Sequence, residues 1–297
     1  MQTDIGSAML RAFAIIRESL SEAQLVRIIA SGALERLFTE ALTEQVLHRA
    51  FFPVREKIRT STYQSFRYTV RELPKSGRVD GQIAVAFDHL DPVVIKGIRT
   101  LETKVVATLQ GDTRETVRAF VENGLRDGKN PVVIAKDIRG VVGLAPNQER
   151  AVANFRASLE GTSGTSPLSY KLRDKRFDKS VKKGELTPEQ IDRMTEAYQK
   201  KMTAHHAETV ARTAAIDAQK LGQRLAWEDS IKKGVVDRDK LYKRWVGVMD
   251  DRERPSHKKM EGNTVHFDQP FSNGQMIPGD GEWNCRCIAR YTIGRPA

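Results

Sequence analysis

The strongest constraint on this 297-residue chain is a set of apolar stripes that repeat every three or four residues. Residues at this spacing share one face of an α-helix, and that face must be buried against another element. Two of the stripes follow clear start signals, Asn130-Pro131 and Thr187-Pro188. In each pair the first residue caps a helix and the proline suits its first turn. The chain is therefore predicted to be mainly α-helical, with long helices in its N-terminal and central regions.

The N-terminal third carries the same helical period, with apolar side chains such as Phe13 and Leu20 on one face. Such a stripe packs either in a small helical bundle or against a partner protein. Pro53 is expected to end a helix, because a proline cannot donate the backbone hydrogen bond that a helix interior needs. The aromatic and β-branched residues of 60–70 favour a short strand.

Further boundaries come from capping and glycine signals. Asp112 is predicted to start a new helix, and Gly222 is predicted to break the long helix that follows Thr187. After Gly234 the chain becomes rich in Gly, Pro and Asn, and the runs 245–249 and 288–293 favour strands.

We therefore predict three segments. Residues 1–84 form an N-terminal helical segment that docks a partner, and residues 85–233 form a central helical body. Residues 234–297 form a small α+β, β-rich module held by its large aromatic side chains.

The charge balance indicates an anionic binding partner. The chain has 49 Lys and Arg residues against 38 Asp and Glu, a formal net charge of +11, and nucleic acid is the most common partner of such a surface. The densest positive segment spans residues 171–183, and its alternative interpretation is an ordinary solvated surface. Its candidate DNA-contact residues are Lys171, Arg173, Lys175, Arg176, Lys179, Lys182 and Lys183.

Several classes of protein are disfavoured. Two cysteines do not make a disulfide framework, and Asp4 and Arg11 are atypical of a signal peptide. No apolar run has the length of a membrane span, so we expect a protein of a reducing cytoplasm without membrane contact. The sequence also lacks the glycine-rich motifs of nucleotide-binding loops and the G-x-S-x-G nucleophile motif of α/β-hydrolases. The acidic residues of 236–240, next to Lys240, leave a metal-dependent nuclease as an alternative.

The C-terminal module carries one ordered constellation of chemistry-bearing residues. Around the sequences DDRERPSH and NCRC, its members are Trp245, Asp250, Asp251, Arg252, Arg254, His257, Gly262, Asn284, Cys285, Arg286 and Cys287. With the proline–glycine pair at 278–279, this arrangement strongly resembles the C-terminal module of phage minor head proteins of the phage Mu F-type head morphogenesis family. The likeness continues upstream to about residue 85. It departs at Ala214, where the family commonly has a glutamate.

The resemblance implies a structural virion protein and no enzyme. Such a protein joins the portal protein and the major capsid or scaffold proteins during head assembly. It lies inside the head or at the portal vertex, where it meets packaged double-stranded DNA without sequence preference and bears on genome packaging or ejection. The alternatives are a nuclease or other enzyme that uses His257, His266 and the cysteines, and a DNA-binding module built on a metal knuckle.

The two cysteines allow two interpretations. In an extended segment Cys285 and Cys287 point to the same face, so with His257 they form a potential zinc set, for which Asp250, Asp251 or His266 would be the fourth ligand. The sequence favours the other interpretation, a cofactor-free cluster in which His257 is hydrogen-bonded and an aspartate pairs with a nearby arginine. A disulfide between residues two apart would be strained.

Overall fold

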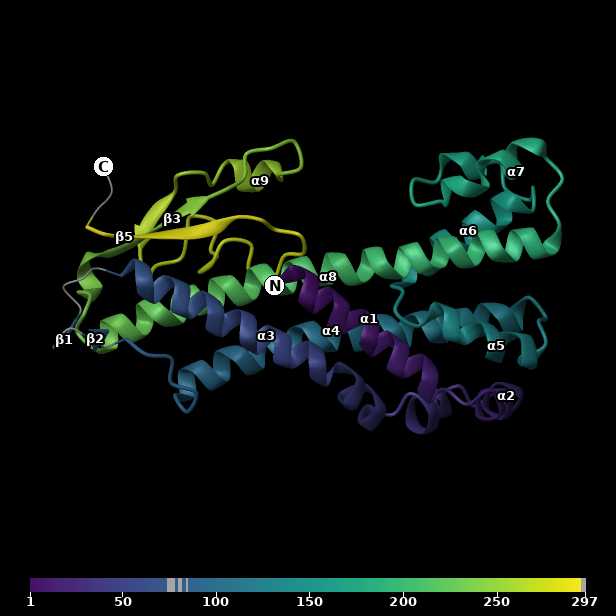
Figure 1. Cartoon of the computed structure of the whole chain (residues 1–297), viewed down its shortest axis with the longest axis horizontal. Helices are drawn as coiled ribbons and strands as arrows, with labels where there is room; N and C mark the ends of the chain where they lie inside the picture. Colours follow the sequence, from purple (N-terminus) through teal and green to yellow (C-terminus); the bar gives the residue numbers. More distant parts are fainter. Residues whose placement is uncertain (74–77, 80–81, 84, 295–297) are drawn as a thin grey trace. The chain divides into compact units, whose positions relative to one another are not determined.

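The computed structural model describes residues 1–73, 78–79, 82–83 and 85–294. The described chain is mainly helical, with a small antiparallel sheet near its C-terminus, which confirms the predicted fold class (Figure 1). The helices are α1 (Gln2–Ser19), α2 (Glu22–Ala30), η1 (Leu37–Ala41), α3 (Glu44–Glu72), α4 (Pro92–Arg126), α5 (Pro131–Val141), α6 (Pro146–Leu159), η3 (Pro167–Ser169), η4 (Lys175–Phe177), α7 (Asp178–Lys183), α8 (Pro188–Lys232), η5 (Arg238–Lys240) and α9 (Pro255–Lys258). The strands are β1 (Arg78–Val79), β2 (Gln82–Ile83), β3 (Leu241–Val246), β4 (Thr264–His266) and β5 (Ile288–Ile293).

Both helix starts predicted from the sequence are confirmed. The side chain of Asn130 accepts the backbone N–H of Val132 at 2.9 Å, and α5 begins at Pro131. At the start of α8, the hydroxyl of Thr187 accepts the N–H of Gln190 at 3.3 Å, and the Gln190 side chain accepts the N–H of Thr187 at 2.9 Å. These reciprocal bonds satisfy donors that the first turn of a helix leaves free.

The predictions for α3 were wrong at two places. Pro53 lies inside this helix and does not end it, and residues 60–70 are helical. The hydroxyls of Thr62 and Thr69 donate to the carbonyl oxygens of Ile58 and Ser65, one helical turn before each. These bonds satisfy the hydroxyl groups of β-branched residues within a helix. Phe66 of the same helix is 2% exposed, so its burial in the core outweighs the local preference for a strand.

The predicted interruptions at Asp112 and Gly222 were also wrong, because α4 and α8 continue through them. The Asp112 carboxylate lies 3.3 Å from Nε2 of His206 and does not cap a new helix. Gly222 is required by packing: a Cβ added there would lie 2.3 Å from the backbone oxygen of Thr62 in α3. A glycine at this position allows two helices to approach closely, and it does not mark a helix end.

The described chain packs as two compact units. Unit 1 contains residues 1–5, 55–104 and 210–297, and unit 2 contains residues 6–54 and 105–209. Helices α3, α4 and α8 therefore each contribute residues to both units. The division into segments 1–84, 85–233 and 234–297 stays a prediction.

Unit 2 buries the apolar stripe of the N-terminal helices. Phe13 is 1% exposed and packs edge-on against Phe51, with ring centroids 6.3 Å apart, and Leu20 is buried as well. These two side chains are therefore part of the unit's own core and are not available to a partner in this structure. A second core in this unit, around Phe155 and Tyr198, receives side chains from the basic segment 171–183.

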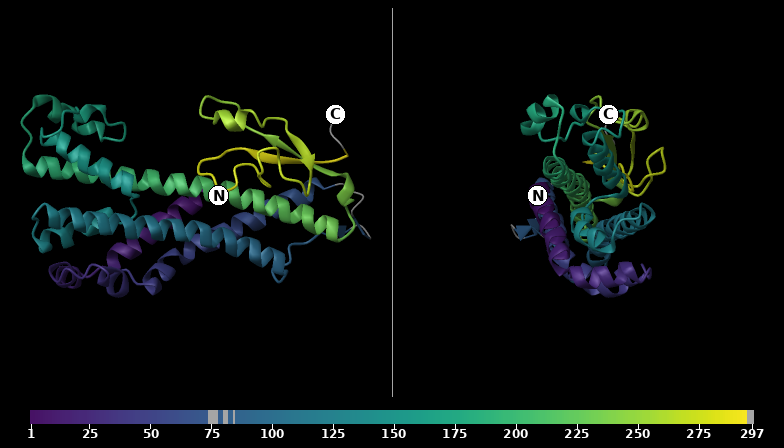
Figure 2. Two further views of the ribbon diagram at one scale, coloured as in Figure 1. Left: turned by 180° about the vertical axis from the view of Figure 1, so that it is seen from behind. Right: turned by 90° about the vertical axis from the view of Figure 1, so that its right-hand side faces the viewer.

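Unit 1 combines helices with the C-terminal sheet. The strand order is β4–β3–β5 with antiparallel pairing throughout, and Figure 2 shows the sheet beside the C-terminal half of α8. Strand β5 matches the predicted 288–293, whereas β3 begins four residues earlier than predicted. Leu241 and Phe267 of the sheet region share a core with Phe66 and Trp227 of the helices, so the C-terminal module completes its core with helical side chains.

The close approach at Gly222 yields a stability prediction. We expect Gly222→Ala to lower the free energy of unfolding by about 1–3 kcal/mol, because the new methyl group overlaps the backbone of Thr62 and a packed neighbour must shift. Urea denaturation followed by circular dichroism would measure the change.

Gly111→Ala is the matched control, because this residue is also within a helix and a Cβ there meets no atom within 4 Å. In that variant the higher helix propensity of alanine should raise stability by about 0.5–1 kcal/mol. Equal effects of the two substitutions would contradict the packing explanation.

Candidate metal centre

The motif residues of the C-terminal module fall into two stretches, 245–262 and 278–287. The first contains the end of β3, a turn, and the one-turn helix α9, which begins at Pro255 and carries His257. The second is an irregular segment that leads into β5, and it carries both cysteines. The two stretches are distant in sequence, and a series of polar contacts brings them together.

Two arginine contacts link the stretches at their surface. The guanidinium group of Arg286 donates two hydrogen bonds to the carboxylate of Asp250, at 2.6 and 2.5 Å. Arg254 donates to Glu282 at 2.8 Å and to the carbonyl oxygen of Trp283 at 2.7 Å. Planar, two-pronged contacts of this kind fix orientation as well as distance. The arginines of the motif are therefore used to hold its own parts in register.

Beneath these contacts lies a cluster of three potential metal ligands. The ring nitrogen Nδ1 of His257 is 3.6 Å from Sγ of Cys285 and 3.4 Å from Sγ of Cys287. The three ligand atoms all lie within 4.8 Å of one another, and the three residues are 3%, 5% and 2% exposed. The structure thus brings together the three residues that the sequence offered as a metal set.

Two carboxylates complete the surroundings of the cluster. The opposite ring nitrogen of His257, Nε2, lies 3.1 Å from Oε1 and 3.0 Å from Oε2 of Glu282. On the other side, Sγ of Cys287 donates to Oε1 of Glu253 at 3.0 Å, and Glu253 is itself buried. Neither glutamate was predicted to have a role in the site, and no spacing pattern marks them.

Glycines make room for this cluster. Gly279 has φ +69°, a conformation that favours glycine, and a Cβ there would lie 2.1 Å from Sγ of Cys285. A Cβ on Gly247 would lie 2.3 Å from Oε1 of Glu253. The glycine of the proline–glycine pair is thus explained by the space that the Cys285 thiol needs.

Two buried lysines hold the loop before the cysteines. Lys220 of α8 donates to the carbonyl oxygen of Pro278 at 2.7 Å, and Lys243 of β3 donates to that of Met276 at 2.8 Å. Lys243 is 2% exposed and its ammonium group lies 5.1 Å from the ring centre of Phe271. The alternation of buried residues along β3 is a sequence signal that could have placed Lys243 inside, but nothing comparable marks Lys220.

The two thiols differ in acidity. Hydrogen bonding with Cys287 lowers the pKa of Cys285 to about 6, with the charge of Lys220 acting in the same direction. The same hydrogen bond, burial and the neighbouring Glu253 raise the pKa of Cys287. Burial works to raise the pKa of Glu282, but hydrogen bonds from His257 and Gln275 outweigh it and hold that pKa below its usual value. The cluster therefore favours one thiolate beside one thiol.

The remaining motif residues support this arrangement or lie outside it. The Trp245 ring packs edge-on against His257 at 5.4 Å, and the backbone N–H of Asn284, at φ +60°, donates to Thr213 of α8 at 3.0 Å. Gly262 also has a positive φ of +79°, and Asp251 and Arg252 are exposed.

Of the candidate fourth ligands, none of the three is part of the ligand group among the described residues. Asp250 is paired with Arg286, Asp251 is exposed, and the His266 ring packs against Tyr242 with centroids 5.6 Å apart.

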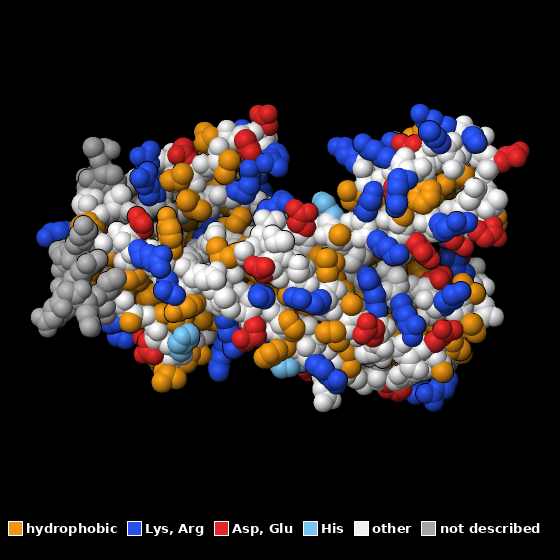
Figure 3. All heavy atoms as spheres, viewed as in Figure 1, with side chains coloured by type: hydrophobic (Ala, Val, Ile, Leu, Met, Phe, Trp, Pro, Cys, Tyr) orange, Lys and Arg blue, Asp and Glu red, His pale blue; other side chains and the backbone are white. Residues whose placement is uncertain are grey.

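The candidate DNA-contact residues lie in unit 2, apart from this module in sequence. Arg173 is paired with Asp178 and Arg176 with Asp174, so part of their charge is neutralised. The five lysines are exposed, and Figure 3 shows Lys and Arg side chains gathered over this region. They are Lys171, Lys175, Lys179, Lys182 and Lys183.

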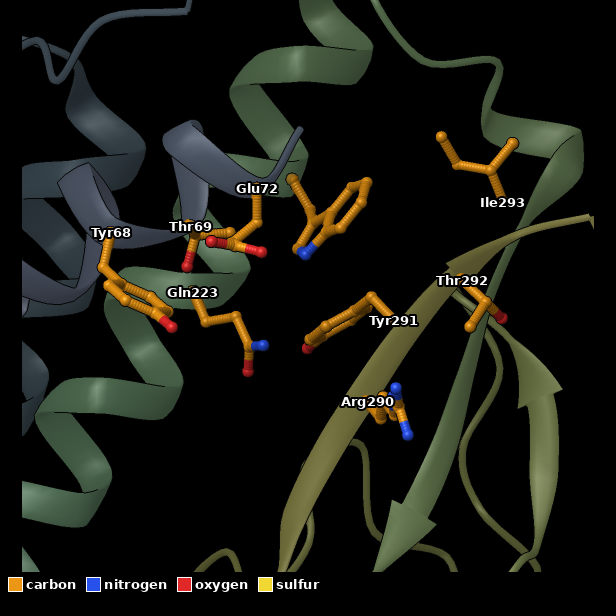
Figure 4. A pocket seen from close by; sticks show the side chains of 9 residues that line it. Tyr68, Thr69, Glu72, Gln223, Arg290, Tyr291, Thr292 and Ile293 are labelled. Carbon is orange, nitrogen blue, oxygen red and sulfur yellow. The ribbon is translucent and has the colours of Figure 1, made fainter. Parts of the chain in front are cut away.

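A separate hollow of about 360 Å³ lies in unit 1 between the end of α3, α8 and β5 (Figure 4). Tyr68, Glu72 and Arg290 contribute polar groups to it, and the buried indole nitrogen of Trp227 has no hydrogen-bond partner among the described residues. Its described lining contains no cysteine or histidine. The hollow is therefore distinct from the cluster around His257.

Comparison with known proteins shows which family part of this chain resembles in sequence. Residues 173–290 match the model of a family described as Phage Mu protein F like protein. The matched range contains both the motif of the C-terminal module and most of the basic segment. The resemblance to the phage Mu F-type head morphogenesis family is thereby confirmed.

One relative is similar in sequence over most of both chains. The minor head protein GP7 of Bacillus phage SPP1 is 25% identical over 274 residues, which cover 88% of this chain and 84% of the relative. No solved structure gives a significant match to the chain. Among the described residues, no helix has both the length and the apolar character needed to cross a membrane.

The buried lysine of β3 gives a prediction on pH. Burial, with repulsion from Arg224 adding to it, lowers the pKa of Lys243 to about 8. The unfolded side chain has a pKa of about 10.4, so between these values the unfolded chain holds a proton that the folded chain has lost. The contribution of this group to stability therefore rises with pH across that window.

We expect the stability of the wild type, relative to a Lys243→Met variant, to increase by on the order of 2–3 kcal/mol between about pH 7.5 and pH 10.5. Urea denaturation of both proteins at each pH would measure it. Lys259→Met, which changes an exposed lysine of the same module, is the control and should show no such trend. A flat difference for Lys243→Met would contradict the inferred pKa.

Proposed function

We propose that this chain is a structural minor head protein of a tailed phage that acts in head morphogenesis. The observation that carries the proposal is the match to the Mu F-like family over residues 173–290. This range includes the whole C-terminal motif, whose two stretches are joined by hydrogen bonds and ion pairs. Alignment of most of the chain with a protein named minor head protein adds to it. Both findings support a structural role in the phage head.

The proposed role is one of assembly and not of catalysis. In the C-terminal module, Asp250, Arg254 and His257 are engaged by other residues of the same motif. The acidic pair considered for a nuclease is used in a turn, where Asp237 accepts the N–H of Asp239 at 3.1 Å and pairs with Lys240 at 3.3 Å. These contacts support a structural role, because the polar groups of the module stabilise its own fold.

We place the protein in the virion, inside the head or at the portal vertex, after synthesis in the host cytoplasm. Its proposed partners are the portal protein, the major capsid or scaffold proteins, and packaged double-stranded DNA. The five exposed lysines of residues 171–183 support the DNA contact, because cations on a surface displace counterions from phosphates. A DNA contact of this kind would bear on genome packaging or ejection.

The head assignment is tested on purified particles of the phage that encodes the chain. We expect mass spectrometry to detect the protein in heads at a small fraction of the major capsid protein. Co-expression with the portal protein of the same phage should give a complex that survives size-exclusion chromatography. Absence of the protein from both proheads and mature heads would overturn the proposal.

The DNA contact is tested by its dependence on salt. If about four lysines meet phosphates, the logarithm of the affinity for random-sequence duplex DNA should fall against the logarithm of the salt concentration with a slope of about −3 to −4. Replacing Lys182 and Lys183 by glutamine should make the slope shallower by about 2. Fluorescence anisotropy with a labelled duplex would measure both.

The matched control replaces Lys129 and Lys136, two exposed lysines of the same unit outside the basic segment. This variant loses the same charge, so an unchanged slope would separate a local contact from a general charge effect. Equal slopes in the two variants, or no binding at low salt, would leave the segment as ordinary solvated surface.

A further inference from the structure

We propose that His257, Cys285, Cys287 and Glu253 bind a structural zinc ion that joins the two stretches of the motif. A tetrahedral site with Zn–S distances of about 2.3 Å and Zn–N distances of about 2.0 Å separates sulfur from nitrogen by about 3.5 Å. The two sulfur–nitrogen distances here are 3.6 and 3.4 Å. The imidazole nitrogen and each of the two sulfur atoms are therefore spaced as a shared zinc ion requires.

The orientation of the imidazole supports an ion at the centre. Both thiols converge on the same ring nitrogen, Nδ1, which can make one strong hydrogen bond in a given tautomer. One ion between the three atoms satisfies all of them at once. The other ring nitrogen faces Glu282, and a carboxylate in this position fixes the tautomer of a metal-bound histidine.

Charge and burial make Glu253 the candidate for the fourth ligand. Its carboxylate lies outside the group of three mutually close ligand atoms, so it must turn toward the ion when zinc binds. This carboxylate is 8% exposed, and its Oε1 lies 3.0 Å from Sγ of Cys287, on the side of the cluster away from Glu282. A buried carboxylate next to two cysteine sulfurs is costly unless positive charge compensates it. A divalent zinc ion together with the ammonium group of Lys220, which holds the loop before Cys285, balances two thiolates and one carboxylate.

Zinc fits this donor set better than other common ions. Thiolate and imidazole ligands together select zinc over magnesium or calcium, which prefer oxygen ligands. Four protein ligands in a buried site leave no open position for a substrate, which is the arrangement of a structural site and not of a catalytic one. The ion would then stabilise the fold directly, because its ligands come from segments that are separate in the unfolded chain.

The same residues would also suit a cysteine nucleophile, with Cys285 activated by His257 and oriented by Glu282. Three observations disfavour that arrangement. Cys285 is 5% exposed, and the described hollow of unit 1 is lined by other residues. The second thiol, on Cys287, also lies within reach of the same histidine nitrogen, whereas a nucleophile needs only one.

The test uses the full-length protein purified from cells grown with added zinc. We expect elemental analysis to find about one zinc ion per chain. After removal of the metal, added cobalt(II) should produce the intense thiolate-to-cobalt charge-transfer absorption of a tetrahedral site with cysteine ligands. A strong chelator should lower the melting temperature of the wild type. No zinc, no such absorption and no effect of the chelator would together overturn the proposal in favour of a metal-free network.

Matched variants locate the ion. His257→Gln and Cys287→Ser should lose the zinc, and Glu253→Gln, which keeps the shape of the side chain, should retain cobalt with a weaker affinity and an altered spectrum. His266→Gln removes the neighbouring histidine of β4 and should keep a full complement of zinc. Loss of zinc from His266→Gln but not from His257→Gln would overturn the assignment of ligands.

Accessibility of the thiols distinguishes the site from a nucleophile. We expect iodoacetamide to alkylate Cys285 and Cys287 slowly in the untreated protein and rapidly after chelation. Rapid alkylation of Cys285 alone, unaffected by chelation, would overturn the zinc site. These measurements use the isolated chain, so their outcome is independent of whether the protein is found in phage heads.

Discussion

The convergence of two irregular stretches on the buried imidazole of His257 is the constraint on which the C-terminal module depends. Polar groups lose hydration when they are buried, so each must find a partner inside the protein. Here Cys285 and Cys287 meet one side of the ring and Glu282 the other. Lys220 of α8 then fixes the loop that approaches the thiols. Gly279 and Gly247 leave the space that the Cys285 thiol and the Glu253 carboxylate occupy, so a larger residue at either position would displace these groups.

The sequence was informative where a local interaction determines the structure. The cap formed by Asn130 was predicted because it depends on residues adjacent in the chain, and the strand at 288–293 because its apolar, β-branched run is itself a local signal. The predicted ends at Pro53 and Gly222 failed for the opposite reason. The Gly222 position is set by the backbone of Thr62, which belongs to another helix, and no rule about glycine in an isolated segment contains that information.

The same distinction holds for the candidate site. The resemblance identified His257 and both cysteines as members of one motif, and the structure brings them together. Glu253 and Lys243 were missed, because their roles arise from contacts across the fold and a buried charged residue has no reliable sequence signature. Arg173, by contrast, was offered as a DNA contact, and the structure pairs it with Asp178. A basic residue in the sequence is therefore not necessarily a free positive charge on the surface, because an ion pair within the chain can neutralise it.

The C-terminal motif uses its polar residues to maintain the local fold, and recognition of a partner depends on other residues. Asp250, Arg254 and His257 face partners within the module, so they are fully engaged in maintaining one local geometry. Residues engaged in this way contribute little to recognition of another molecule, because breaking their internal contacts to bind a partner would expose unsatisfied charges. The motif then accounts for the local fold of the C-terminal module. Recognition of anionic partners falls to side chains that are exposed and unpaired, which in the described part of unit 2 include the five lysines of residues 171–183.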